Sequence, residues 1–135
     1  MSDTEATAKK LLDEHSALKR RAVTLEGLVT DPVRLDAELG AIEGILRKHF
    51  DMEEVGGYMS AVRSVAPGEE ANLRRLRGDH DDLWGRLRQL RQMTSRAAPE
   101  GELRDRLREW LDLLARHESE EHQLITRHLG DPEAK

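Results

Sequence analysis

The two halves of the chain repeat one pattern of apolar residues, spaced alternately by three and four positions. In the first half the pattern runs through Leu11, His15, Leu18, Ala22 and Leu25, and then through Leu35, Leu39, Ile42, Leu46, His49 and Glu53. A shift of 65 residues turns the first run into Leu76, His80, Leu83, Leu87 and Leu90, and a shift of 68 turns the second into Leu103, Leu107, Trp110, Leu114, His117 and Glu121. Such spacing places the apolar residues on one stripe of an α-helix and is typical of helices packed at shallow angles. The sequence therefore predicts four helices, of which the first two are repeated as the third and fourth.

Turn-forming residues separate these helical segments. Asp31 followed by Pro32 is typical of a helix start, and Pro67 with Gly68 divides the second segment from the third. The expected helices span about 5–29, 32–62, 69–95 and 100–129 within a single domain of residues 1–135. Because the connections are short, neighbouring helices should run antiparallel. The predicted fold class is all-α, an up-down-up-down four-helix bundle with a di-metal site in its core.

The composition narrows the classes of protein to which the chain can belong. A formal net charge of −5 argues against a nucleic-acid partner, because such partners bind a positive patch or stripe. Without cysteine, the chain has neither a disulfide framework nor a thiolate metal site. No apolar stretch approaches the length of a membrane span, and the polar N-terminus does not resemble a signal peptide. We therefore expect a cytoplasmic protein that contacts neither a membrane nor nucleic acid.

Six polar residues interrupt the apolar stripes: His15, His49, Glu53, His80, His117 and Glu121. One histidine lies on each expected helix, and two of them are followed four residues later by a glutamate on the same helix face. A buried carboxylate is strongly unfavourable unless a cation balances it, and no lysine or arginine occupies these stripes. A pair of metal ions would balance the two glutamates. The alternative is a polar layer of His–Glu hydrogen bonds without metal.

The ligand types narrow the choice of metal. Imidazole and carboxylate ligands without thiolate favour iron or manganese over a structural zinc site. Six ligands, two of them carboxylates able to bridge, are typical of a di-metal site inside a helix bundle. The ligand types therefore predict two non-haem metal ions, either iron or manganese.

With these residues in the order H…HxxxE…H…HxxxE, the sequence resembles bacterial members of the hemerythrin-like family over roughly residues 5–130. The resemblance implies one iron on His15 and His49 and the other on His80 and His117. It also implies that Glu53 and Glu121 bridge the two ions, with an oxo or hydroxo group between them.

The chain departs from the oxygen-carrying members of that family at two positions. Those proteins have a further histidine one turn after the third-helix ligand, where this chain has Trp84. Their fourth-helix motif is HxxxxD, whereas Glu121 here follows His117 by four residues. The reduced ligand set implies an open position on each iron and argues against reversible oxygen carriage. Relatives with such a set include proteins that consume peroxide, react with nitric oxide or sense iron.

On this basis we predict a di-iron oxidoreductase of the catalase or peroxidase type. Its partners would be hydrogen peroxide and other small oxidants or gases, including nitric oxide and dioxygen, and it would act as a monomer or small homo-oligomer. The alternative is a non-catalytic module that binds oxygen or nitric oxide reversibly or senses iron or redox state.

Two further residues are candidate metal ligands. Tyr58 is the only tyrosine, it follows Gly56 and Gly57, and a phenolate is a good ligand for ferric iron. His122 directly follows Glu121 and is a candidate spare ligand. The alternatives are an ordinary buried tyrosine and a histidine that lies outside the metal site.

Overall fold

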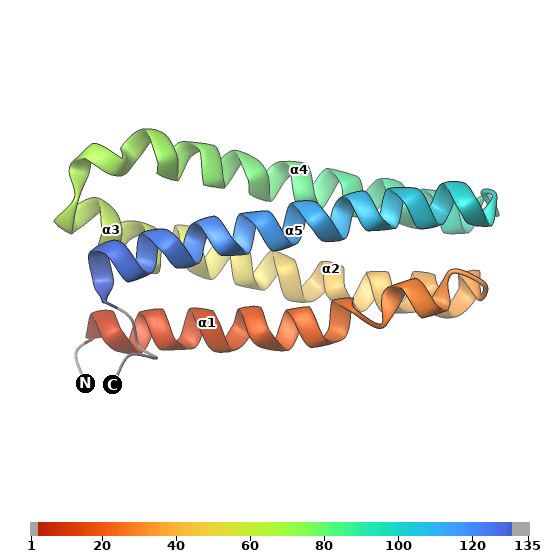
Figure 1. Ribbon diagram of the computed structural model, residues 1–135, viewed down its shortest axis with the longest axis horizontal. Helices are drawn as coiled ribbons and strands as arrows, with labels where there is room; N and C mark the ends of the chain where they lie inside the picture. Colours follow the sequence, from red (N-terminus) through yellow and green to blue (C-terminus); the bar gives the residue numbers. More distant parts are fainter. Residues whose placement is uncertain (1–2, 131–135) are drawn as a thin grey trace.

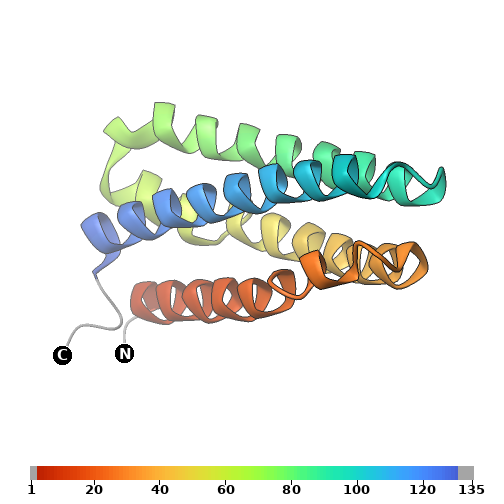
Figure 2. The ribbon, with the colours of Figure 1, turned by 45° about the vertical axis from the view of Figure 1, so that its right-hand side comes forward.

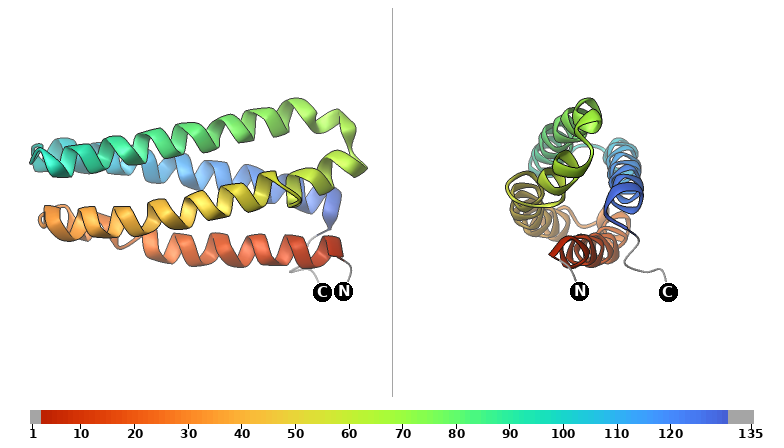
Figure 3. Two further views of the ribbon diagram at one scale, coloured as in Figure 1. Left: turned by 180° about the vertical axis from the view of Figure 1, so that it is seen from behind. Right: turned by 90° about the vertical axis from the view of Figure 1, so that its left-hand side faces the viewer.

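Four long helices surround a common core in the computed structural model, which describes residues 3–130. They are α1 (Asp3–Ala22), α2 (Pro32–Glu54), α4 (Glu70–Ser95) and α5 (Glu100–Leu129). Successive long helices run in opposite directions (Figure 1). Seen from the end of the bundle, they follow one another around the core in the order α1, α2, α4, α5 (Figure 3). The predicted all-α, up-down-up-down four-helix bundle is confirmed.

The first helix is shorter than the expected span of about 5–29. α1 ends at Ala22, and a short 3-10 helix, η1 (Leu25–Leu28), follows it. The β-branched pair Val23 and Thr24 lowers helix propensity at this point, and the Thr24 hydroxyl donates a hydrogen bond to the Arg21 carbonyl at 2.8 Å. Leu25 is nevertheless fully buried, so the apolar stripe continues through the tighter turn.

The second expected helix, about 32–62, is divided in the structure. α2 ends at Glu54, and a separate helix, α3 (Tyr58–Val65), begins after Gly56 and Gly57. Gly56 has a φ of +74°, a left-handed conformation that stops the α-helix and that glycine adopts without strain. α3 lies across the end of the bundle, against α1, α2 and α5, and a 3-10 turn, η2 (Pro67–Glu69), leads on to α4 (Figure 2). The break therefore brings Tyr58 into the core.

Gly57 lies closely against the backbone at the end of α2. A Cβ atom at Gly57 would lie 2.1 Å from the Met52 carbonyl oxygen and 2.9 Å from that of Glu53. We expect Gly57→Ala to lower the free energy of unfolding by about 3 kcal/mol, because backbone atoms of α2 must move to make room. Chemical denaturation measures this change. Gly44→Ala within α2 is the control, since a Cβ there meets nothing within 4 Å. This substitution should raise the free energy of unfolding by about 0.5–1 kcal/mol. Equal effects of the two substitutions would contradict the prediction.

The apolar core consists of two clusters, one on each side of a polar layer. The larger cluster includes Leu18, Leu46, Leu83 and Leu114 and fills the half of the bundle that contains η1. The smaller cluster includes Tyr58, Met59 and residues of α1, α4 and α5, at the α3 end. The polar layer between them contains all six residues that interrupt the apolar stripes. Within residues 3–130, no helix is long and apolar enough to cross a membrane.

Candidate metal centre

The polar layer brings one histidine from each long helix to the same level of the bundle. His15 lies on α1, His80 lies on α4, and α2 and α5 each contribute a histidine and the glutamate one turn later. All six side chains are buried, with at most 7% of any residue exposed. Because the partners of each His–Glu pair are four residues apart, both point to the same side of their helix.

The ligand atoms form two overlapping groups. His15 and His49 make one group, His80 and His117 make the other, and both groups contain Glu53 and Glu121. Within each group, each of the four residues offers one nitrogen or oxygen atom, and these four atoms all lie within 4.8 Å of one another. One oxygen of Glu121, Oε1, lies 3.2 Å from Nε2 of His15 and 3.2 Å from Nε2 of His117. Both glutamates therefore belong to both groups of candidate ligands.

Seven polar atoms of this layer lack a hydrogen-bond partner within the described residues. Among the residues that the structure describes, seven buried side-chain nitrogen or oxygen atoms have no hydrogen-bond partner, and all belong to these six residues. They include Nε2 of all four histidines and both carboxylate oxygens of Glu53. Buried polar atoms normally have partners, and a whole layer without them is explained by an ion. The donor set therefore fits metal binding.

Carboxylates outside the layer fix the orientation of the imidazole rings. Nδ1 of His49 lies 2.6 Å from Glu14, and Nδ1 of His80 lies 2.7 Å from Glu54. In the same way, Nδ1 of His117 lies 3.1 Å from Asp79. A metal-bound histidine typically donates its second ring N–H to such a carboxylate, which turns the other nitrogen toward the ion. The fourth histidine, His15, has Glu118 at the longer distance of 3.6 Å.

The charges of the layer compensate one another without metal. Burial disfavours a charged imidazole, but the nearby carboxylates of Glu121 and Glu53 outweigh it and raise the pKa of His15, and likewise of His80, to about 10. Burial also opposes ionisation of Glu121, yet its contacts with Glu53 and three histidines hold its pKa well below the usual range. Protonated imidazoles therefore lie beside an ionised Glu121. A metal ion can take the place of these protons, because metal binding requires neutral imidazole.

Comparison with known protein families gives a match to the hemerythrin HHE cation binding domain over residues 6–129. The chain belongs to this hemerythrin family. The resemblance seen in the sequence is thereby confirmed, and the chain is a metal-binding module of the hemerythrin type. Neither the curated proteins nor the solved structures gave a match.

The two additional candidate ligands lie in different surroundings in this hemerythrin domain. Tyr58 is buried, and its hydroxyl donates a hydrogen bond to Oε2 of Glu121 at 2.5 Å. Burial and the neighbouring carboxylates raise the pKa of Tyr58 far above its usual value, so the phenol keeps its proton. His122 is half-buried, belongs to neither ligand group, and lines a cleft between α1 and α5.

Substitution of Tyr58 separates its two possible roles. We expect Tyr58→Phe to lower the free energy of unfolding by about 1–3 kcal/mol, because Glu121 loses a buried hydrogen-bond donor. The visible absorption of the iron-loaded protein should stay the same, since the structure favours a hydrogen bond to Glu121 over ligation of a metal. Thermal unfolding and an absorption spectrum of the same sample measure both quantities. Loss of a visible band in the variant would instead identify Tyr58 as an iron ligand.

Glu14 and Asp79 are functional candidates that the sequence reasoning did not include. Each directly precedes a histidine of the layer, as Glu14-His15 and Asp79-His80, and the two pairs correspond in the internal repeat. Each acid contacts the histidine of the neighbouring helix rather than its own sequence neighbour. The repetition of this acid–histidine pair in both halves could have identified the two acids as candidates. Which histidine each acid contacts depends on the packing of the helices.

Asp79 provides a test of this outer group of carboxylates. We expect Asp79→Asn to weaken metal binding by about 10–100-fold, because His117 loses the carboxylate that orients its ring. Competition with a coloured chelator measures the affinity. Asp82→Asn is the matched control on the same helix, since Asp82 lies at the surface and pairs, among residues 3–130, only with Arg86. Equal affinities of the two variants would show that Asp79 does not support the metal centre.

Proposed function

We propose that the polar layer holds two iron ions. One ion would bind His15 and His49, the other would bind His80 and His117, and Glu53 and Glu121 would bridge them. The supporting observation is that both glutamates belong to both ligand groups. Imidazole with carboxylate suits iron, and manganese remains the alternative metal.

We further propose that the bound pair destroys hydrogen peroxide, with nitric oxide and dioxygen as further small molecules able to reach it. Each group supplies two imidazoles and two shared carboxylates, which leaves coordination positions open on ions that accept six ligands. Iron bound there would supply the electron transfer that peroxide chemistry requires.

The residues of the chain would set the environment for that reaction. The apolar clusters above and below the layer limit access of water. The buried hydroxyl of Tyr58 keeps its proton and donates it in a hydrogen bond to Oε2 of Glu121, with 2.5 Å between the two oxygen atoms. The carboxylate of Glu118 lies beside His15 at the rim, where it can accept or return a proton.

The test is oxygen release from excess hydrogen peroxide by iron-loaded protein. We expect many turnovers, with one molecule of oxygen formed for every two of peroxide consumed. Activity should be lost in Glu121→Gln, which keeps the shape of the side chain but removes its charge. His128→Ala on the same helix is the control, since His128 contacts Glu69 at 2.9 Å instead of the polar layer.

Two results would overturn the peroxide proposal. If peroxide is not consumed, the centre has another role. If nitric oxide or oxygen forms a stable stoichiometric adduct without turnover, the domain is a binding or sensing module.

A further inference from the structure

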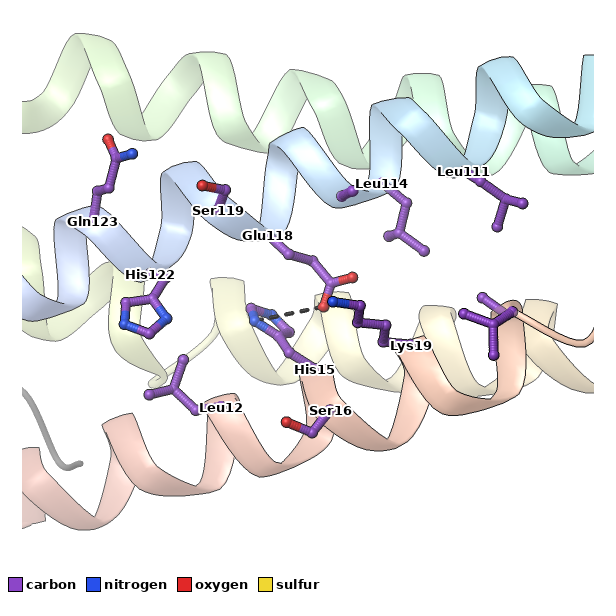
Figure 4. Close-up of a pocket in the computed structure, with 13 residues that line it drawn as sticks. Leu12, His15, Ser16, Lys19, Leu111, Leu114, Glu118, Ser119, His122 and Gln123 are labelled. Atoms are coloured by element: carbon purple, nitrogen blue, oxygen red, sulfur yellow. Dashed lines mark ion pairs between the residues drawn. The ribbon is translucent and has the colours of Figure 1, made fainter.

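A cleft of about 510 Å³ opens between α1 and α5 directly beside His15. Figure 4 shows His15, Ser16 and Lys19 on one wall and Glu118, Ser119 and His122 on the other, with Leu111 and Leu114 further along α5. The cleft is therefore polar near the metal centre and apolar toward η1. Peroxide or a diatomic gas occupies little more space than a water molecule, whose share of liquid volume is about 30 Å³. The cleft has the size of a site for an organic ligand.

The internal repeat places a second cleft on the opposite face, between α2 and α4 beside His80, with a volume of about 380 Å³. Shifts of 65 and 68 residues map one cleft onto the other. The corresponding positions are Arg47 and Ala115, Phe50 and Glu118, Trp84 and Lys19, and Arg88 and Val23. Large side chains thus narrow the α2/α4 cleft, where Phe50 stacks on His80 with ring centroids 3.9 Å apart. Smaller side chains leave the α1/α5 cleft open.

The two clefts also differ in charge. Five charged residues line the α2/α4 cleft: Arg47, Asp51, Glu54, Asp81 and Arg88. Their counterparts in the α1/α5 cleft carry no formal charge: Ala115, Ser119, His122, Ser16 and Val23. Two charged residues remain there, and one of them, Glu118, faces His15. The other, Lys19, has no hydrogen bond or ion pair with any residue that the structure describes. The cleft therefore combines apolar walls with one exposed cation, Lys19, and one anion, Glu118, which is paired with His15.

We propose that the α1/α5 cleft binds a medium-chain aliphatic monocarboxylate. The carboxylate would lie on the ammonium group of Lys19, on the side of Glu118 that faces away from His122 (Figure 4). The aliphatic chain would lie against Leu111, Leu114 and Val23, along a length of α5 of roughly 10 Å between Leu111 and Glu118. A bound acid covers the His15 side of the metal centre, and this role is separate from the reaction with peroxide.

Isothermal titration of the iron-loaded protein with octanoate tests the proposal without peroxide. We expect one octanoate per chain. Lys19→Gln should weaken binding about two- to fivefold, as expected for loss of an exposed ion pair. Octanol, which has the same chain without the charge, should bind the unmodified protein and Lys19→Gln equally. Ala115→Arg, which restores the arginine of the other cleft at an exposed position, should weaken octanoate binding at least about tenfold by filling the cleft.

Arg47→Ala is the matched control in the α2/α4 cleft, and it should leave octanoate binding unchanged. Circular dichroism and iron content confirm that each variant is folded and loaded. Absence of binding, or an affinity that neither Lys19→Gln nor Ala115→Arg changes, would overturn the proposal. A shift of the iron absorption bands by octanoate would also overturn it, because the carboxylate would then bind the metal instead of Lys19.

Discussion

Replacement of Glu121 by glutamine should leave a folded bundle that cannot hold two metal ions. Glu121 is fully buried and belongs to both ligand groups, so its loss removes a ligand from each ion at once. Loss of an outer partner typically weakens metal binding by about 10–100-fold, and loss of a shared ligand should weaken it more. We expect the metal content to fall from two ions per chain to one or none. Elemental analysis after removal of free metal measures this content.

Glu120→Gln is the matched control for that experiment. Glu120 is the preceding residue of the same helix, but its carboxylate pairs with Arg75 outside the polar layer. The control should bind the same amount of metal as the unmodified protein. Full occupancy in Glu121→Gln would show that the ions do not share this glutamate.

Removal of the metal should destabilise the bundle strongly. The metal-free layer contains seven buried polar atoms without a hydrogen-bond partner, and ions that bind only the folded state stabilise it by mass action. At a free concentration of about 100 times the Kd, each ion contributes about 2.7 kcal/mol. We therefore expect iron to raise the Tm by roughly 10 °C or more for a domain of this size. Calorimetry with and without a chelator measures the shift.

Calorimetry of Glu121→Gln with and without a chelator provides the control, since iron should raise the Tm of this variant little. An unchanged Tm of the unmodified protein after removal of the metal would favour the alternative interpretation of the sequence. The layer would then be a structural arrangement of histidine and glutamate that needs no metal.

The fold class could be predicted because it depends on periodicity, which is a local property of the sequence. The interruptions inside the helices were harder to predict. The apolar stripe continues through Leu25 although α1 ends at Ala22, so the pattern of burial conceals the change to a 3-10 helix. Gly56 and Gly57 lie inside the expected second helix, and the pattern did not predict that α3 would lie across the end of the bundle.

The grouping of the six polar residues could also be inferred from the sequence, because each histidine interrupts an apolar stripe at the same depth. Their outer partners could not be inferred in this way. Contacts such as Glu14 with His49, or Tyr58 with Glu121, join residues 35 and 63 positions apart. Such pairs depend on the rotation of each helix about its axis, which packing of the whole bundle determines.

The repeat predicted that the two halves would be alike, but the side chains around their histidines differ in the structure. The inner ligands correspond, yet Phe50 stacks on His80 where its counterpart Glu118 faces His15. The two ions would therefore have different surroundings in spite of matching ligands. Any difference in their reactivity should follow from these outer side chains.

Mössbauer spectroscopy of the iron-loaded protein tests the central claim most directly. Two ferric ions that share Glu53 and Glu121 in one buried layer should be magnetically coupled and give a diamagnetic spectrum, with two irons per chain. Uncoupled ferric ions with magnetic splitting, or one iron per chain, would contradict a shared di-iron centre in this bundle.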